Sequence, residues 1–69
     1  MESLLRAKEV AGILNVRVST VYDLAHRGVL RHVRITQGKR RSLIRFRESD
    51  LEKLIRERTV ATPTNHLTN

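Results

Sequence analysis

The 69-residue sequence predicts one small α+β domain made of two short helices, a β-hairpin and a third helix. Three observations support this fold class. Apolar residues recur at helical spacing in three segments, they alternate with polar residues in two segments before the last helix, and the chain is too short for a second hydrophobic core. We expect the domain to span residues 1–58 and a disordered tail without apolar period to span residues 59–69.

The first two helices are predicted to meet at a tight corner. Apolar positions 7, 10, 11 and 14 form one helical stripe, which ends at Asn15, a residue that tolerates the left-handed backbone of a helix C-terminus. A second stripe at positions 18, 21, 24 and 25 is closed by Gly28. Only about three residues therefore join the two helices.

Such a short connection is typical of a helix-turn-helix. Ala11 is small enough to lie where the two helices cross closely, and Asn15 can open the turn with a positive φ. An antiparallel pair in a small bundle is the alternative, but the strands that follow at once and the one-sided charge favour the helix-turn-helix. The side chains expected to fill the angle between the helices are Val10, Leu14, Val16, Val21 and Leu24.

A β-hairpin is predicted after the corner. Val33 and Ile35 alternate with polar residues in the first strand, and Ile44 and Phe46 do so in the second. The polar stretch between them, which includes Gln37-Gly38-Lys39, gives the hairpin a basic tip, and Arg40 and Arg41 are expected either in the tip or in the second strand. We therefore expect two half-buried strands.

The third helix is predicted from residues 48–58. Leu51, Leu54 and Ile55 form its apolar stripe. Ser49 and Glu52 have the spacing of a capping box at its start.

The net charge of +7 is concentrated in one segment. Residues 24–47 contain eight Lys and Arg residues and no Asp or Glu. This clustering predicts a polyanionic partner, with nucleic acid ahead of an anionic membrane surface. The absence of cysteine, of a signal peptide and of an apolar run of about 18 residues predicts a soluble cytoplasmic domain without disulfides.

The sequence does not predict an enzyme. Ser19, Asp23 and His26 share one predicted helix face, but a single exposed helix offers neither a pocket nor an oxyanion hole for a catalytic triad. The histidines at positions 26, 32 and 66 lack metal-ligand spacing, and we expect them to be polar surface groups. No cofactor and no metal ion are expected.

Several motifs, taken in order, resemble the excisionase-type branch of the MerR-like winged-helix domains. The resemblance covers residues 4 to about 56. The sequence departs from the family pattern at Arg6 and Arg17, which stand where Ser or Thr usually caps the first two helices. Losing such a cap lowers the free energy of unfolding by about 1 kcal/mol. The wing is also richer in Arg and Lys than in most members. The motifs are Leu4-Leu5, Glu9-Val10-Ala11, the stretch from Val16 to Tyr22, Arg27-Gly28, and Phe46 leading into Asp50-Leu51-Glu52.

The resemblance implies a winged helix-turn-helix that binds specific double-stranded DNA. Family members without a further domain typically act as recombination directionality factors in a bacterial host, bending DNA so that an integrase excises a phage or other mobile element. The resemblance thus implies contacts with DNA, with an integrase and with further copies on tandem sites, and no small-molecule effector. It also leaves open a small transcription regulator.

Two further classes are less favoured by the residues. Single-stranded RNA recognition needs aromatic stacking platforms, whereas Tyr22 and Phe46 are the only aromatic residues, and Phe46 is expected in the core. A protein-binding module whose basic face meets an acidic partner is the other alternative.

The second helix is expected to lie in the major groove. Arg17 and Ser19 are the candidate base readers, because a recognition helix reads bases with its N-terminal half. Tyr22 is expected to contact a phosphate or a sugar. The predicted DNA-contacting residues of this helix are Arg17, Val18, Ser19, Thr20, Tyr22, Asp23, His26 and Arg27.

Three of these residues need separate interpretation. Thr20 is expected to be half-buried against the first helix. Val18 has two open interpretations, which are core packing and contact with a thymine methyl group. For Asp23, an i,i+4 pair with Arg27 is favoured over accepting a hydrogen bond from cytosine.

The hairpin supplies the second set of predicted contacts. Its cations are expected to contact the DNA backbone or to enter a narrow minor groove. They are Arg34, Lys39, Arg40, Arg41 and Arg45.

Overall fold

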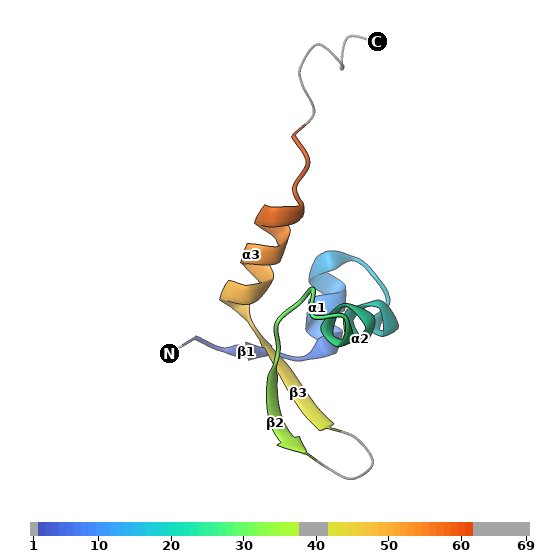
Figure 1. Cartoon of the computed structure of the whole chain (residues 1–69), viewed down its shortest axis with the longest axis vertical. Coiled ribbons are helices and arrows are strands. Elements are labelled where there is room, and N and C mark those ends of the chain that lie inside the picture. Colours follow the sequence, from blue (N-terminus) through green and yellow to red (C-terminus); the bar gives the residue numbers. More distant parts are fainter. Residues whose placement is uncertain (1, 38–41, 62–69) are drawn as a thin grey trace.

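The computed structural model describes residues 2–37 and 42–61, and it confirms the predicted α+β winged helix-turn-helix class (Figure 1). The predicted wing tip and most of the predicted tail lie outside these residues. None of the helices within the two described ranges has the length and hydrophobicity that crossing a bilayer requires. The elements in chain order are β1 (Leu4–Leu5), α1 (Ala7–Leu14), α2 (Val18–His26), β2 (Val33–Gln37), β3 (Ser42–Arg47) and α3 (Glu48–Arg58).

Helix α1 begins and ends at the predicted residues. Arg6 is its N-cap with an extended backbone, and the Arg6 N–H donates to Glu9 Oε1 at 2.8 Å. The guanidinium of Arg6 cannot accept a bond in return, because it carries only donors, so half of a capping box is formed. At the other end Asn15 adopts the left-handed conformation, with φ 57° and ψ 49°.

The turn between α1 and α2 is held by the backbone. The Ala11 carbonyl accepts from the N–H groups of Asn15 and Val16, the latter at 3.0 Å, as in a Schellman-type helix end. The Val16 side chain is 40% exposed. The prediction that it fills the angle between the helices is therefore wrong, because this residue serves the turn through its N–H group.

The core lies where the two helices meet the sheet. Val10 and Ala11 of α1 pack with Val21 and Ala25 of α2 in one buried cluster, as the helical stripes predicted. Leu14 and Leu24 are partly buried against this cluster. The remaining buried members are Ala7, Leu30, Phe46, Leu51 and Leu54.

The loop after α2 adds a core residue that periodicity does not reveal. Gly28 adopts a positive φ of 75°. The chain then folds back, so that the N–H groups of Val29 and Leu30 both donate to the Leu24 carbonyl, at 3.0 and 3.2 Å. This reversal places Leu30 in the core, where it is fully buried.

The sheet has three antiparallel strands in the order β1-β3-β2. Strand β1 was not predicted, because two residues are too few to show a period. Leu5 pairs with Phe46 and Leu4 with Arg47, so β1 lies against the end of β3 from which α3 continues. Figure 1 shows α3 extending in one direction from this point, and the C-terminal end of β2 with the N-terminal end of β3 in the opposite direction.

A β-bulge interrupts the hairpin at Ile35. Arg34 pairs with Ile44 and Thr36 with Leu43, which leaves Ile35 without a partner on β3. Ile35 is consequently 46% exposed, and the prediction that it is half-buried is wrong. The strict alternation assumed for this strand fails because the extra residue changes which side chains face the helices.

Helix α3 begins directly after β3, with Arg47 as its N-cap. The predicted Ser49–Glu52 capping box is wrong, because Ser49 already lies in the first turn. Instead, the Ser49 N–H and hydroxyl both donate to the carboxylate of Glu2, each at 2.9 Å. The cap thus comes from the N-terminal segment, which the pairing of β1 with β3 places next to α3.

Candidate nucleic-acid interface

Helix α2 has one buried face and one exposed face. Val21 and Ala25, one helical turn apart, are its buried residues, and Leu24 is half-buried beside them. The rest of its surface is exposed to solvent and, apart from Val18 beside the buried face, polar. It contains all the residues of this helix that were predicted to contact DNA, namely Val18, Ser19, Thr20, Tyr22, Asp23 and His26, flanked by Arg17 and Arg27.

The N-terminus of α2 presents an arginine in place of a capping hydroxyl. Arg17 is the N-cap with φ −76° and ψ 152°, and its carbonyl accepts from the N–H groups of Thr20 and Val21 at 3.0 and 3.3 Å. Its side chain makes no capping bond and is exposed. The guanidinium therefore adds to the partial positive charge of the helix N-terminus, a combination that attracts phosphate and guanine acceptors.

The exposure of Val18 and Thr20 tests two further predictions. Val18 is 38% exposed, which excludes the core-packing role and leaves a thymine-methyl contact as the prediction. Thr20 is exposed, so the prediction that it is half-buried is wrong. Because successive helical residues are rotated by about 100°, the inward position falls on Val21 and turns Thr20 toward solvent.

Asp23 and Arg27 form the predicted i,i+4 ion pair. Arg27 Nε lies 3.5 Å from Asp23 Oδ2, and the two side chains are 66% and 59% exposed. A pair this exposed contributes at most about 1 kcal/mol, so a phosphate can replace the carboxylate at small cost. The pair holds the Arg27 guanidinium near the C-terminus of α2.

The two predicted wing contacts that the structure describes, Arg34 and Arg45, differ in their surroundings. Arg34 is exposed on β2. Arg45 is partly buried, and its Nη1 donates to the Ile44 carbonyl at 2.7 Å. Since Arg34 pairs with Ile44 and Arg45 pairs with Val33, the two arginines lie on opposite faces of the hairpin. The other predicted wing residues, Lys39, Arg40 and Arg41, lie outside the described residues.

Two cations in the basic segment were not assigned a role from the sequence, namely Arg31 and Arg47, the N-cap of α3. Arg31 is exposed in the loop that joins α2 to β2, between the two sets of predicted contacts. Its position inside the acid-free stretch of residues 24–47 was the available signal. Sequence periodicity did not single it out, because it lies in no regular element.

The histidines divide into two environments. His26 is exposed on α2, as predicted. His32 is partly buried, and its ring lies 6.3 Å from that of Phe46 at a tilt of 58°, so the surface prediction is wrong for this residue. Within the part of the chain that the structure describes, no group of three or more His, Cys, Asp or Glu side chains is placed to hold a metal ion.

Comparison with known proteins adds one match. The profile of a family described as "Helix-turn-helix domain" matches residues 4–59, a range that includes every helix and strand of the structure. No curated protein and no solved structure matches the chain at a significant level. The match thus concerns the whole fold around α1 and α2, including the hairpin and α3.

Proposed function

The chain belongs to this helix-turn-helix domain family and is a sequence-specific DNA-binding protein, and we propose that it acts as an excisionase-type recombination directionality factor of the MerR-like branch. In this role, copies of the protein bind tandem sites on duplex DNA in a bacterial cytoplasm and bend the DNA. An integrase, contacted by these copies, then excises a phage or other mobile element. Helix α2 enters the major groove, and the hairpin contacts the flanking backbone or minor groove.

The distribution of charge along the fold carries this proposal. Residues 24–47, which contain eight Lys and Arg residues and no acid, run from the second half of α2 to the end of β3. The exposed arc of α2, with Arg17 and Arg27 beside it, overlaps the start of this segment. A protein that recognises a sequence in duplex DNA needs both features, because phosphate contacts position the protein whereas base contacts select the sequence.

The size of the reading element supports binding in several copies. Helix α2 has nine residues and α3 has eleven. A single module of this kind covers only about 600–1,000 Å² of its own surface on DNA, so one copy gains limited affinity and specificity. Adjacent copies that touch on the DNA raise each other's effective concentration. We therefore expect weak binding to one site and cooperative binding to tandem sites.

The proposal is tested on duplexes that contain one, two or three copies of a site selected from random DNA. Footprinting measures cooperativity, circularly permuted fragments measure bending, and an excision reaction with a purified integrase of the same element measures the recombination role. We expect tandem occupancy, a bend and increased excision. Binding without a bend or any effect on excision would favour the transcription regulator, and preferential binding to single-stranded RNA would reject both.

A further inference from the structure

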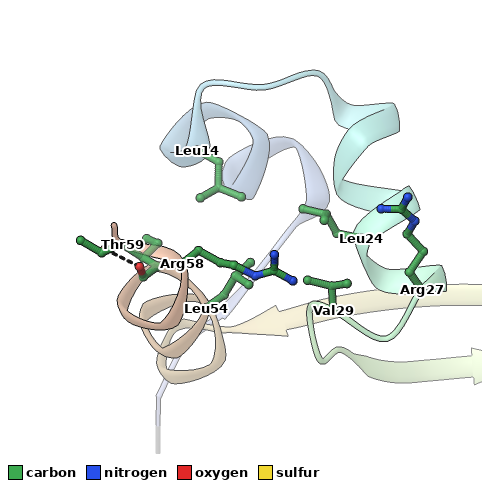
Figure 2. Close-up of a pocket in the computed structure, with 8 residues that line it drawn as sticks. Leu14, Leu24, Arg27, Val29, Leu54, Arg58 and Thr59 are labelled. Atoms are coloured by element: carbon green, nitrogen blue, oxygen red, sulfur yellow. Dashed lines mark hydrogen bonds between the residues drawn. The ribbon is translucent and has the colours of Figure 1, made fainter. Parts of the chain in front are cut away.

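An apolar groove opens between α3 and the C-terminal ends of α1 and α2. Its volume is about 400 Å³, and Figure 2 shows the side chains that line it. Several of these aliphatic side chains are only partly buried, so the groove exposes apolar surface that a ligand can cover. The aliphatic lining consists of Leu14 from α1, Leu24 from α2, Val29 from the loop after α2, and Leu54 and Ile55 from α3.

The polar part of the groove lining is positively charged. Arg27 and Arg58 line it, and no acidic residue among residues 2–37 and 42–61 does. Figure 2 shows Arg58 reaching from α3 across the opening toward Val29. Thr59 also lines the groove, where its Oγ1 donates to the Ile55 carbonyl at 2.5 Å. The groove thus combines an aliphatic floor with the guanidinium of Arg58, and Arg27, whose own guanidinium pairs with Asp23, lies at its α2 edge.

We propose that this groove binds an acidic amphipathic helix of a protein partner. Aliphatic side chains of that helix lie on the floor, and its carboxylates meet Arg58 first and Arg27 where they displace Asp23 from it. An amphipathic helix presents side chains at i, i+3, i+4 and i+7 to such a groove, and arginine binds carboxylates through two parallel hydrogen bonds. Charge complementarity selects an acidic helix over a basic one.

DNA and the chain's own segments fit this groove less well. A phosphate backbone would cover the aliphatic floor without making favourable apolar contacts with it. The acidic segment of this chain, α3, already uses Leu51 and Leu54 in its own core, so a second copy cannot offer that face. Residues 59–69 contain no Asp or Glu, so they carry no side chain that would pair with the two arginines.

The location of the groove allows a partner and DNA to bind together. It lies beside α3, and Figure 1 shows α3 extending away from the end of the hairpin where β2 stops and β3 begins. Among the residues that the structure describes, Arg27 alone belongs both to the groove and to the residues proposed to contact DNA. The inference goes beyond the proposed function, because it assigns a surface and a partner chemistry that the recombination role does not specify, and it does not depend on DNA bending.

The test uses the full chain and a dye-labelled synthetic helical peptide that carries leucines at i, i+3, i+4 and i+7 with glutamates beside them. A peptide with lysines in place of the glutamates is the charge control. We expect amide NMR shifts at Leu14, Leu24, Val29 and Ile55 with the acidic peptide only. Arg58→Glu is expected to weaken binding by roughly tenfold.

Two matched variants separate the groove from general electrostatics. Arg56→Glu makes the same charge change in the last turn of α3 but does not line the groove, and we expect it to weaken binding by less than about twofold. Ile55→Ser is expected to weaken binding about fivefold through lost apolar contact, whereas Ile35→Ser, on a side chain of similar exposure, is expected to leave it unchanged.

Four results would overturn the inference. The first is an equal loss of peptide affinity in Arg58→Glu and Arg56→Glu, and the second is peptide-induced amide shifts on the exposed arc of α2 instead of in the groove. The third is self-association of the chain through the groove, seen by ultracentrifugation. The fourth is that the acidic peptide does not bind. Circular dichroism confirms that each variant is folded. Since no DNA is present, failure here leaves the proposed recombination role untouched, and failure of the DNA experiments leaves the groove untouched.

Discussion

The carboxylate of Glu2 caps the first turn of α3 through Ser49, a residue 47 positions away. Its Oε1 accepts from the Ser49 N–H and its Oε2 from the Ser49 hydroxyl, both at 2.9 Å. The backbone hydrogen bond from Ser49, followed by the hydroxyl bond and the nearby Arg47 charge, holds the pKa of Glu2 below its ordinary value of 4.5. The N-terminal segment is thereby tied to the helix that follows the wing.

Removing this carboxylate is expected to lower the melting temperature at neutral pH. The folded-state pKa of Glu2 is depressed, so its contribution is present above the unfolded value of 4.5 and is lost as the pH falls through the lower folded value. The gap in melting temperature between wild type and Glu2→Gln should therefore be present at pH 7 and shrink below about pH 4.5. Thermal unfolding followed by circular dichroism from pH 7 to pH 2.5 measures this gap.

A double-mutant cycle with Ser49→Ala provides the control. The two changes remove parts of the same contact, so their effects on the free energy of unfolding should be less than additive. Additive effects, or a gap that stays constant with pH, would show that Glu2 acts elsewhere in the fold.

The Glu2 cap also shows why some of the fold could not be predicted from the sequence. The ends of α1 and α2 were predictable because Asn15 and Gly28 set positive φ locally, whatever lies nearby in space. By contrast, β1 exists only because Leu4 and Leu5 pair with β3, and the cap of α3 depends on that pairing. Such long-range partners leave no periodic pattern in the sequence.

The candidate site was predictable to a similar extent. The positions of Val21 and Ala25 fix the inward face of α2, so most of its exposed arc followed from helical geometry, except at Thr20, which was expected to be half-buried, and Val18, which was left open. The wing was less predictable, because the bulge at Ile35 shifts the register and Arg45 is held by the Ile44 carbonyl. Periodicity cannot reveal a single inserted residue or a side-chain bond to the backbone.

Two glycines provide a paired test of the backbone. An added Cβ meets no atom within 4 Å at either Gly12 or Gly28, but only Gly28 has a positive φ, of 75°. Gly12→Ala should therefore stabilise α1 by about 0.5–1 kcal/mol, and Gly28→Ala should destabilise the fold by about 1–2 kcal/mol. Urea unfolding without DNA measures both changes. Equal effects of the two substitutions would contradict the left-handed turn at Gly28.

Substitution of Asp23 distinguishes its two interpretations. Asp23 is the only acidic residue of α2, and it pairs with Arg27. If the pair is its main role, Asp23→Asn should strengthen binding to all duplexes by up to about 1 kcal/mol, or roughly fivefold in Kd, because a charge that repels phosphate is removed. Fluorescence anisotropy with several duplexes measures this. A selective loss of affinity for duplexes with one particular cytosine would instead identify Asp23 as a base contact.

Arg17 and Arg34 are expected to contribute to DNA binding in different ways. Arg17, at the N-terminus of α2, is placed to read a base, so Arg17→Ala should weaken binding to the preferred site by about 1–3 kcal/mol and reduce discrimination at one base pair. Arg34, exposed on the wing, should act through phosphate, so Arg34→Ala should weaken binding to all duplexes alike and reduce the slope of log K against log salt by about one. Competition binding with singly mutated sites at several salt concentrations measures both effects. Wild-type discrimination in Arg17→Ala would remove this residue from base reading, and a site-dependent loss in Arg34→Ala would place the wing against base edges.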